Sequence, residues 1–484
     1  MEGLFWQLLL WTTGFTGFLF CLSDHLKSKA AGSKKPNFVI ILADDIGWGD
    51  LGVNWGESED TPHLDKMAQE GMRFVDFHAA ASTCSPSRAA LLTGRLGLRN
   101  GVTHNFAISS VGGLPLNETT LAEVLKGAGY RTAMIGKWHL GHHGFHHPNF
   151  RGFDDYFGIP YSNDMGCTDT PGYNLPPCPS CPQHPKATSE SGQPFFLYIA
   201  LAHMHVPLSV PQGRGNLSCK GPYGSTLREM DELVRKIKEN VDSTVRENTV
   251  IWFTGDNGPW SEKCDFAGSV GPFIGAWQTE RGGSSAKQTT WEGGHRVPAI
   301  VYWPGKVPAN VTSPALLSIL DIFPTLASLA NISLPSNRHF DGLDVSQVIF
   351  GNSHEGHKTL FHPNSGAAGK HGAIQTVRLE QYKAFYVTGG AKACDGGLGP
   401  EVHHNPPLIF NLGQSIQEKV PLDRRAAEYQ NILPKIERTL AAILQDIATD
   451  NVSRADYSQD PSATPCCNPQ HLVCRCEPSN RAFS

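Results

Sequence analysis

The sequence predicts an α/β fold in which a large β-sheet is covered by helices on both faces. Three observations support this: four continuous apolar runs, amphipathic helix candidates between them, and polar side chains where each run ends. Runs of this length that are rich in β-branched and aromatic residues are typical of strands buried on both faces. The four runs are Asn37–Ala43, Thr132–Ile135, Phe195–Leu201 and Thr249–Thr254.

Amphipathic stretches between and after these runs are predicted to form the covering helices. Residues 226–241 place apolar side chains on one stripe at helical spacing, and Thr119–Gly129 and Ser318–Leu329 are further candidates. Ala299–Trp303 is predicted to be a further strand. The apolar stripes of these helices are explained by an ordinary core and imply no site.

The pattern changes after about residue 350. Short strand candidates typical of an antiparallel sheet follow, and Pro434 is predicted to open a helix with apolar side chains along one face. We therefore expect a main domain over residues 35–350 and a small C-terminal subdomain over residues 351–484, with a Cys-rich tail from Cys466. The strand candidates are Ile374–Leu379, Tyr382–Val387 and Leu408–Asn411.

Each of the four runs of the main sheet ends in side chains of the kind that bind ligands. In open α/β sheets, ligands bind beyond the carboxyl ends of the strands, so we expect one shared site there. Taken singly, Asp44-Asp45 is more often a helix cap or a turn, and Asp256-Asn257 before a glycine is a good turn motif. Together they favour a metal ion, because carboxylate and amide oxygens suit Ca²⁺. The residues at the four ends are Asp44, Asp45, Lys137, His139, His203, His205, Asp256 and Asn257.

A short predicted helix begins beside Cys84. Ser85 is the expected N-cap, Pro86 suits the first helical position, and Gly94 is placed to end the helix. Cys84 then lies at the positive end of the helix, and Arg88 adds a cation near the same face. Such an anion-binding corner is suited to a reactive cysteine. The alternative for a lone cysteine before a helix is a structural or disulfide-bonded residue.

Composition and charge favour a secreted, loop-rich protein. The net charge of -5 does not suggest general binding to nucleic acid or to anionic membranes. The apolar run Leu4–Leu22 predicts a signal peptide over residues 1–24, with an uncleaved signal anchor as the alternative. No later segment is apolar enough to cross a bilayer, so we expect no stable membrane insertion.

Cysteines and glycosylation motifs indicate an oxidising compartment. Apart from Cys21 and Cys84, ten cysteines remain, enough for five disulfide bonds whose pairing the sequence does not reveal. Cys178 and Cys181 are interpreted as a structural disulfide loop, because no helix or second paired motif indicates a redox or zinc site. Five N-x-S/T motifs predict a glycoprotein. Their asparagines are Asn117, Asn216, Asn310, Asn331 and Asn451.

Two long motifs resemble the signatures of the sulfatase family. Residues 84–95 match C-x-P-S-R-x-x-L-x-x-G-R at every specified position, and residues 129–139 match G-Y-x-T-x-x-x-G-K-x-H. The resemblance implies an alkaline-phosphatase-like α/β fold, with a large mixed sheet between helices and a small C-terminal domain of antiparallel sheet and helix. It also implies that the formylglycine-generating enzyme of the endoplasmic reticulum oxidises Cys84 to formylglycine, whose hydrate attacks a sulfate ester.

The resemblance further implies a metal site. Asp44, Asp45, Asp256 and Asn257 would bind Ca²⁺ together with the formylglycine at position 84, although the ligand set alone would fit Mg²⁺ as well. A second, zinc-binding site is disfavoured, because the remaining histidines of the loop lie among glycines outside the family motif. These histidines are His142, His143, His146 and His147.

Roles for the surrounding cations are implied in the same way. Arg88 would hold the hydrate together with the metal, while His205 and Lys287 would protonate the leaving oxygen. His139 would be the base that expels sulfate. The implied catalytic residues are Cys84, Arg88, Lys137, His139, His205 and Lys287, and the implied substrate-binding residues are Ser162, Lys137, His205 and Lys287.

The resemblance runs from about Pro36 to the Cys-rich end and is sharpest to one lysosomal member of the family. It implies a lysosomal enzyme that travels the secretory pathway, with the 3-O-sulfate of glucosamine in heparan sulfate as natural substrate and aryl sulfates as artificial substrates. The stretch 182–194 is much shorter than in the family. We therefore also consider retention in the endoplasmic reticulum, an extracellular location, and an impaired chain that at most binds glycans. A phosphate or phosphonate ester hydrolase is the alternative among enzymes.

Overall fold

The computed structural model describes residues 35–464, with the exception of 57, 166–192, 209–217 and 219. Some of the predicted features lie outside these described residues. They are the signal peptide over 1–24, the Cys178–Cys181 loop, the Asn216 motif, most of the stretch 182–194 and the tail from Cys466.

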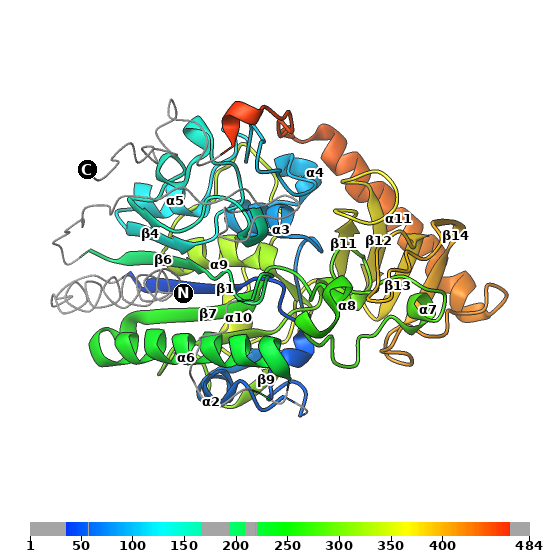
Figure 1. Cartoon of the computed structure of the whole chain (residues 1–484), viewed down its shortest axis with the longest axis horizontal. Coiled ribbons are helices and arrows are strands. Elements are labelled where there is room, and N and C mark those ends of the chain that lie inside the picture. Colours follow the sequence, from blue (N-terminus) through cyan, green and yellow to red (C-terminus); the bar gives the residue numbers. More distant parts are fainter. Residues whose placement is uncertain (1–34, 57, 166–192, 209–217, 219, 465–484) are drawn as a thin grey trace, which may run out of the picture.

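The main body of the protein is an eight-stranded mixed sheet (Figure 1). Its strands are β1 (Asn37–Ala43), β2 (Met72–Phe74), β4 (Arg131–Gly136), β5 (Asp155–Phe157), β6 (Phe195–Ala200), β7 (Thr249–Gly255), β8 (Ala299–Tyr302) and β9 (Val311–Ser313). They lie in the order β5-β4-β6-β1-β7-β8-β2-β9. The strands from β5 to β7 are parallel, whereas β8 is antiparallel to both of its neighbours. The four predicted runs are therefore adjacent parallel strands.

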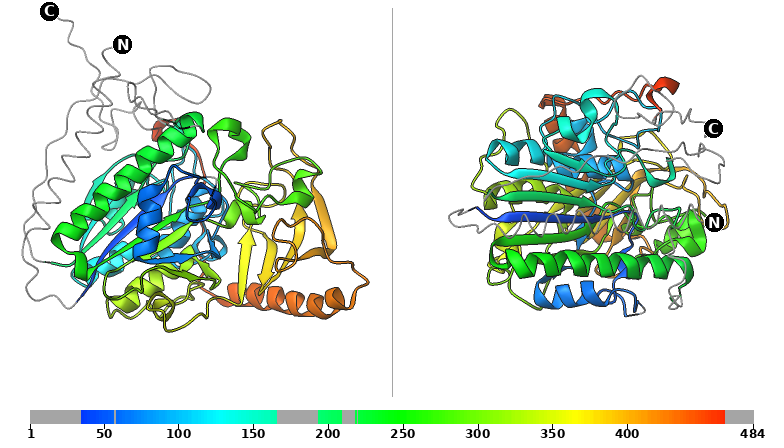
Figure 2. Two further views of the ribbon diagram at one scale, coloured as in Figure 1. Left: turned by 90° about the horizontal axis from the view of Figure 1, so that it is seen from below. Right: turned by 60° about the vertical axis from the view of Figure 1, so that its left-hand side comes forward.

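Helices cover both faces of this sheet (Figure 2). They are α2 (Pro62–Glu70), α3 (Cys84–Thr93), α5 (Leu121–Gly127), α6 (Gly221–Thr244) and α9 (Ile322–Leu329). Phe38, Ile40 and Leu42 of β1 pack in the layer with α3, α5 and α9. Val39 and Ile41 pack in the opposite layer with α2 and α6, which lie below the strands in Figure 1. Burial on both faces is the reason why β1 is apolar without alternation.

The C-terminal region forms a four-stranded antiparallel sheet with one long helix packed on it (Figure 1). Its elements are β11 (Thr359–Pro363), β12 (Ile374–Leu379), β13 (Tyr382–Thr388), β14 (Val402–Asn411) and α11 (Ala427–Thr449). The prediction that Pro434 opens the helix is wrong, because α11 begins at Ala427 and contains Pro434. Tyr429, Ile432 and Ile436, before and after the proline, pack in one cluster with the sheet. This packing keeps the turns before Pro434 helical despite the missing N–H.

Shorter elements complete the described chain. The strands are β3 (Phe77–His78) and β10 (Leu317–Ser318), which pair with each other, and the short helices are α4 (Gly97–Asn100), α7 (Ala276–Thr279), α8 (Glu292–His295) and α10 (Ser346–Ile349). The 3-10 helices are η1 (Trp48–Asp50), η2 (Gly144–His146), η3 (Pro148–Phe150), η4 (Asn163–Met165), η5 (Arg246–Asn248), η6 (Ser261–Phe266), η7 (Ile319–Asp321) and η8 (Pro461–Ala463). Within the described ranges, no helix combines the length and apolar character needed to cross a membrane.

Buried charges join the C-terminal sheet to the main body. Lys383 of β13 donates a hydrogen bond of 2.8 Å to Glu292, and Arg378 of β12 donates one of 2.8 Å to Asp76. Glu292 opens α8, five residues after the predicted site residue Lys287. The network therefore anchors the segment that carries Lys287.

A disulfide bond adds a covalent connection. It joins Cys264 of η6 to Cys394, which lies 130 residues later between β13 and β14. This is one of the pairs that the sequence left open. Among the described cysteines, Cys84 is the free one.

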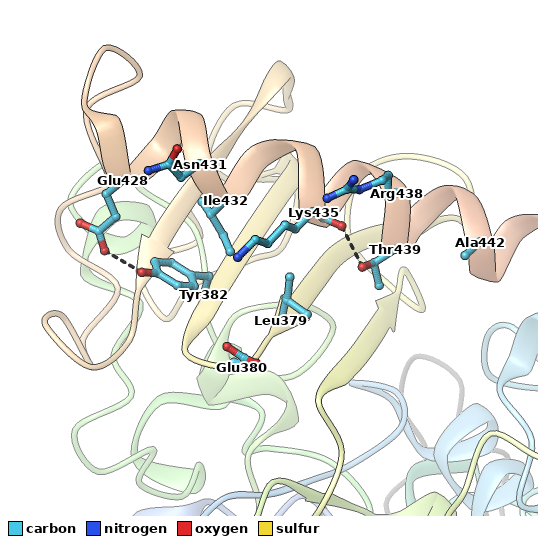
Figure 3. A pocket seen from close by; sticks show the side chains of 10 residues that line it. All are labelled: Leu379, Glu380, Tyr382, Glu428, Asn431, Ile432, Lys435, Arg438, Thr439 and Ala442. Carbon is cyan, nitrogen blue, oxygen red and sulfur yellow. Dashed lines mark hydrogen bonds between the residues drawn. The ribbon is translucent and has the colours of Figure 1, made fainter.

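A groove lies between α11 and the β12–β13 hairpin (Figure 3). Its walls carry charges of both signs, with Lys435 and Arg438 on the helix and Glu380 in the hairpin turn. Tyr382 donates a hydrogen bond of 3.0 Å to Glu428 at one end. None of the predicted site residues lines this groove, so it is separate from the site described next.

Candidate active site

The carboxyl ends of four neighbouring strands bring the predicted residues together. β1 pairs in parallel with β6 and β7, and β4 pairs in parallel with β6, so these four strands end at the same edge of the sheet. Asp44 follows β1, Lys137 follows β4, His205 lies beyond β6, and Asp256 follows β7. The contacts between their side chains show that this edge is a single site.

Helix α3 places Cys84 at this edge. Cys84 is the first residue of the helix, so the expected N-cap at Ser85 is wrong by two positions, and Thr83 is the N-cap residue. Instead of capping the helix, the Ser85 hydroxyl donates a hydrogen bond of 2.8 Å to the carbonyl of His139. The helix ends as predicted at Gly94, whose φ of 67° is a left-handed conformation that glycine adopts without strain.

Two ion pairs and the Cys84 thiol form the innermost part of the site. Lys137 Nζ lies 2.6 Å from Asp44 Oδ2 and 3.3 Å from Cys84 Sγ. Arg88 Nη2 lies 2.7 Å from Asp256 Oδ2. All five side chains are completely buried. Two fixed cations therefore lie around the cysteine, as an anion-binding site requires.

Asp45 is the centre of a second group of contacts. Lys287 Nζ lies 2.6 and 2.7 Å from its two carboxylate oxygens, and Asn257 Nδ2 donates a hydrogen bond of 2.8 Å to Oδ1. His205 Nε2 lies 3.7 Å from Oδ2. Lys287 and His205, which are far apart in the sequence, thus meet at one carboxylate.

Burial and neighbouring charges shift the pKa values of the innermost groups. Burial alone would raise the pKa of Asp44, but Lys137 and Arg88 hold it well below its usual range. Burial and the charge of Asp44 raise the pKa of Asp256 to about 7. Burial raises the pKa of the Cys84 thiol far above neutral pH, so the thiol itself is protonated and is a poor nucleophile.

The oxygen atoms at this edge fit a divalent cation. Ligand atoms of Asp44, Cys84 and Asp256 all lie within 4.8 Å of one another. The side-chain oxygen of Asn257 is buried and lacks a hydrogen-bond partner, which is the situation that a bound cation would resolve. A cation would also relieve the repulsion that raises the pKa of Asp256. The donor set is hard and oxygen-rich, and it suits Ca²⁺ and Mg²⁺ alike.

His139 lies two residues after Lys137, and its backbone contacts the segment that carries Ser162. His139 Nε2 lies 3.1 Å from the carbonyl oxygen of Phe106, which can only accept a hydrogen bond, so Nε2 carries the proton. Its Nδ1 is buried without a partner, and burial and Lys137 lower the pKa of the ring well below its usual value. The neutral ring thus presents a free lone pair. The backbone of His139 donates to Pro160, which brings the segment of the buried Ser162 close.

The other histidines of the 142–147 loop do not join the site. His142 and His146 each place a ring nitrogen 3.0 Å from a backbone carbonyl. No metal-binding group in the described part of the chain includes a histidine of this loop. His203 supports the site through its backbone, because its carbonyl accepts a hydrogen bond of 2.6 Å from Asp44.

Trp260 belongs to the site and was not predicted. The Lys287 ammonium lies 4.4 Å from the centroid of its ring, and the ring of His205 lies 5.4 Å away. The sequence could have indicated Trp260 only through its position. It lies three residues after Asn257, in the loop beyond β7 that begins with two proposed metal ligands. A single aromatic residue in a loop has no periodicity that would have marked it.

Four of the predicted glycosylation sites lie on the described surface. Their asparagine side chains are exposed, as attachment of a glycan requires. They are Asn117, Asn310, Asn331 and Asn451.

Fixed cations around a buried carboxylate cluster, at the carboxyl edge of a mixed α/β sheet, define a hydrolase of anionic esters. Comparison with known proteins specifies the ester. The chain belongs to the sulfatase family: the Sulfatase family model matches residues 36–332, and the model for the C-terminal region of aryl-sulfatase matches residues 355–476. It is therefore a sulfuric ester hydrolase, and membership of the family implies a formylglycine and a metal ion.

Relatives support this assignment over nearly the whole chain. Arylsulfatase G of Canis lupus familiaris is 63% identical over 523 aligned positions, which cover 99% of this chain and 98% of the relative. Arylsulfatase G of Homo sapiens is 63% identical, with 99% and 100% covered. These alignments are longer than the 484 residues of this chain, so the relatives contain residues that it lacks.

A solved structure supports the fold. The crystal structure of the PsFucS1 sulfatase from Pseudoalteromonas sp. superposes with a TM-score of 0.73. The match covers 90% of this chain and 95% of that chain, at 24% sequence identity. At this identity the similarity demonstrates a shared architecture of large sheet, helices and C-terminal sheet.

Proposed function

We propose that this sulfatase uses a formylglycine made from Cys84, with Ca²⁺ as its metal ion. The observation that carries the proposal is the position of Cys84 Sγ, 3.3 Å from Lys137 Nζ and 3.5 Å from Asp44 Oδ1. The sulfur atom stands where the oxygen groups of formylglycine would be placed. The formylglycine would supply, in its hydrated form, the oxygen nucleophile that the protonated thiol does not provide. The formylglycine-generating enzyme of the endoplasmic reticulum is the partner that this maturation requires.

The proposed metal ligands are Asp44, Asp45, Asp256 and Asn257, together with the modified residue 84. Ca²⁺ suits a set of several carboxylate and amide oxygens. When bound there, it would neutralise negative charge on the sulfate group and hold it in place.

The fixed cations of the protein would orient the sulfate ester. Arg88 lies against Asp256, and its Nη1 donates a hydrogen bond of 2.8 Å to the carbonyl of Lys137, so its guanidinium cannot rotate away. Lys137 and Ser162 would bind oxygen atoms of the sulfate group. All of these side chains are buried, which excludes water and strengthens each electrostatic contact.

Proton transfers are assigned to the remaining residues. Breaking the ester bond leaves an electron pair on the alcohol oxygen, and Lys287 or His205 would donate the proton that neutralises it. His139 would take up a proton at Nδ1, the nitrogen that lacks a partner, when sulfate is released. Lys287 and His205 meet at Asp45, which places both possible donors on the same side of the site.

The proposed natural substrate is the 3-O-sulfate of glucosamine in heparan sulfate, with aryl sulfates as test substrates. The proposal rests on the resemblance to arylsulfatase G. The alignments with the Canis lupus familiaris and Homo sapiens proteins each cover 99% of this chain. The proposed route is the secretory pathway to the lysosome, with glycans at the exposed asparagines. A secreted or retained product is the alternative route.

The deciding experiment measures hydrolysis of a small aryl sulfate by purified protein and by its Cys84→Ala variant. We expect activity in the wild type and a loss of at least about 1000-fold in the variant, because the variant lacks the nucleophile. Mass analysis of the peptide that contains residue 84 should show an aldehyde in place of a thiol. Faster hydrolysis of aryl phosphate than of aryl sulfate would contradict the proposal.

A second candidate is a catalytically impaired glycoprotein that binds glycans. The observation in its favour is that the relatives contain residues that this chain lacks. Under this alternative, heparan sulfate oligosaccharides would bind to the protein without release of sulfate. Stoichiometric sulfate release in the same assay would exclude it.

A further inference from the structure

We infer that Trp260 is a positioning residue, which holds Lys287 and His205 where they can protonate the leaving oxygen. The inference rests on the proposed function, because the proton-donor roles come from there. The indole has no acidic or basic group suited to the reaction. Its effect on catalysis must therefore pass through the residues that it contacts.

The ammonium group of Lys287 is held from two sides. The two oxygens of Asp45 lie 2.6 and 2.7 Å from Nζ, and the centroid of the Trp260 ring lies 4.4 Å from it. A lysine side chain is flexible, so a single contact leaves its charged end several arrangements. The negative face of an indole attracts a cation within about 6 Å. The indole and the carboxylate together restrict Nζ to one position.

His205 is held by the same two groups. Its ring centroid lies 5.4 Å from that of Trp260 with a tilt of 56°, within the range of favourable aromatic contacts. Its Nε2 lies 3.7 Å from Asp45 Oδ2. Trp260 is thus in contact with both proposed proton donors.

The indole is itself firmly supported. Its Nε1 donates a hydrogen bond of 3.1 Å to Glu262, and Lys263 Nζ lies 4.1 Å from the ring centroid. The next residue, Ser261, is hydrogen-bonded to Ser284 at 2.7 Å. The Cys264–Cys394 disulfide anchors the same segment four residues after Trp260. A rigid platform of this kind can hold a flexible lysine in place.

The chemistry provides a specific readout. As the bond between sulfur and the leaving oxygen breaks, the electron pair stays on that oxygen, and a proton from Lys287 or His205 neutralises it. An acidic phenol leaves readily without this help, whereas a weakly acidic phenol needs it. A misplaced donor should therefore cost more activity as the leaving phenol becomes less acidic. A general loss of structure would reduce activity on all esters alike.

The test compares 4-nitrophenyl sulfate with phenyl sulfate in the wild type, Trp260→Phe and Trp260→Leu. For Trp260→Leu we expect kcat to fall roughly 3-fold on the nitrophenyl ester and roughly 30-fold on the phenyl ester, as loss of a desolvated cation–π contact allows. Trp260→Phe, which keeps a weaker ring face, should lie between. KM should change less than kcat, because Lys137 and Ser162, which would hold the sulfate group, are not among the residues that the indole contacts.

The matched control is Trp277→Leu. Trp277 is also part-buried and forms a cation–π contact, with Arg281 at 4.2 Å, but it touches neither proposed proton donor. In this variant, kcat should fall by the same factor on the nitrophenyl ester and on the phenyl ester. Equal losses on both esters in Trp260→Leu would overturn the inference. If Trp260→Leu does not fold, the test uses Trp260→Phe, and the ratio of its kcat losses on the two esters decides between a positioning role and a general loss of structure.

A second readout is independent of activity. Lys287→Met should change the tryptophan emission of the wild type, and the same substitution should leave the emission of the Trp260→Phe protein unchanged. Equal changes in both backgrounds would contradict the contact. If the wild type hydrolyses no sulfate ester, the proposed function fails, and this measurement still decides whether Trp260 holds Lys287.

Discussion

Arg88 and Asp256 form a completely buried ion pair, in which two guanidinium nitrogens lie 2.7 and 2.9 Å from one carboxylate oxygen. The pair connects α3, which begins at Cys84, to the end of β7. Such a pair is costly to break from one side, because the remaining charge is left buried without its partner.

Arg88→Met should therefore destabilise the protein by about 3–5 kcal/mol and abolish aryl sulfate hydrolysis. Chemical denaturation gives the free energy of unfolding. The control is Arg235→Met on α6, whose partners Glu232 and Glu239 are 35% and 60% exposed; its cost should be at most about 1 kcal/mol. Equal losses in the two variants would contradict the structural role of Arg88.

Removal of the proposed metal ion should lower stability as well as activity. Asp44 and Asp256 are buried close together, so chelation would remove a cation that adds to Lys137 and Arg88 in offsetting their mutual repulsion. We expect EGTA to lower the melting temperature and to abolish hydrolysis, and excess Ca²⁺ to restore both. In Asn257→Ala the restoration should need a higher Ca²⁺ concentration. A melting temperature that does not respond to Ca²⁺ in either protein would exclude a calcium site.

Stability should fall with rising pH because of Asp50. Burial raises the pKa of this carboxyl group to about 6 in the folded protein, from 3.8 in the unfolded chain. Between these values the folded state holds the proton more tightly, so raising the pH through this window removes up to about 3 kcal/mol of stability. Asp50 accepts a hydrogen bond from Tyr223 at 2.6 Å.

Denaturation curves between pH 4 and pH 7, for the wild type and Asp50→Asn, isolate this effect. The variant is expected to be less stable at pH 4, because its amide places hydrogens toward groups that donate to Asp50. Between pH 4 and pH 7, however, the free energy of unfolding of the variant should decrease less than that of the wild type. Parallel profiles of the two proteins would show that Asp50 does not titrate in this window.

The buried contact between Lys383 and Glu292 should hold the two sheets together. Both side chains are completely buried, so Lys383→Met should cost about 3–5 kcal/mol. Because Glu292 anchors the segment of Lys287, aryl sulfate hydrolysis should fall as well. Lys419→Met is the matched control: Lys419 lies 2.8 Å from Glu280, but both side chains are about half exposed, so the change should be small. A small effect of Lys383→Met on stability would contradict a role in joining the sheets.

The core of the fold and the position of the site were predictable because both depend on local patterns. The run Asn37–Ala43 is apolar without alternation, which already requires a strand covered on both faces. The polar residues after it and after its neighbours could be assigned to one site, because parallel strands end at the same edge. Gly94 could be assigned as a helix end for an equally local reason, since its left-handed φ favours glycine.

Predictions failed where contacts between residues distant in the sequence determine the local structure. Tyr429, Ile432 and Ile436 hold Pro434 inside α11, although proline by itself favours a helix start. Thr83 replaces Ser85 as the N-cap residue because the Ser85 hydroxyl is bonded to His139.

The sequence by itself determined the family, the strands β1, β4, β6, β7 and β8 of the main sheet, and the polar residues after four of them, because motifs and hydrophobic patterns are properties of short segments. Only the tertiary structure decided how these residues pair. It placed Lys287 on Asp45 and Arg88 on Asp256, and it brought Trp260 into the site. The physical reason is that ion pairs, cation–π contacts and disulfides depend on distances between segments, which the order of residues along the chain does not contain.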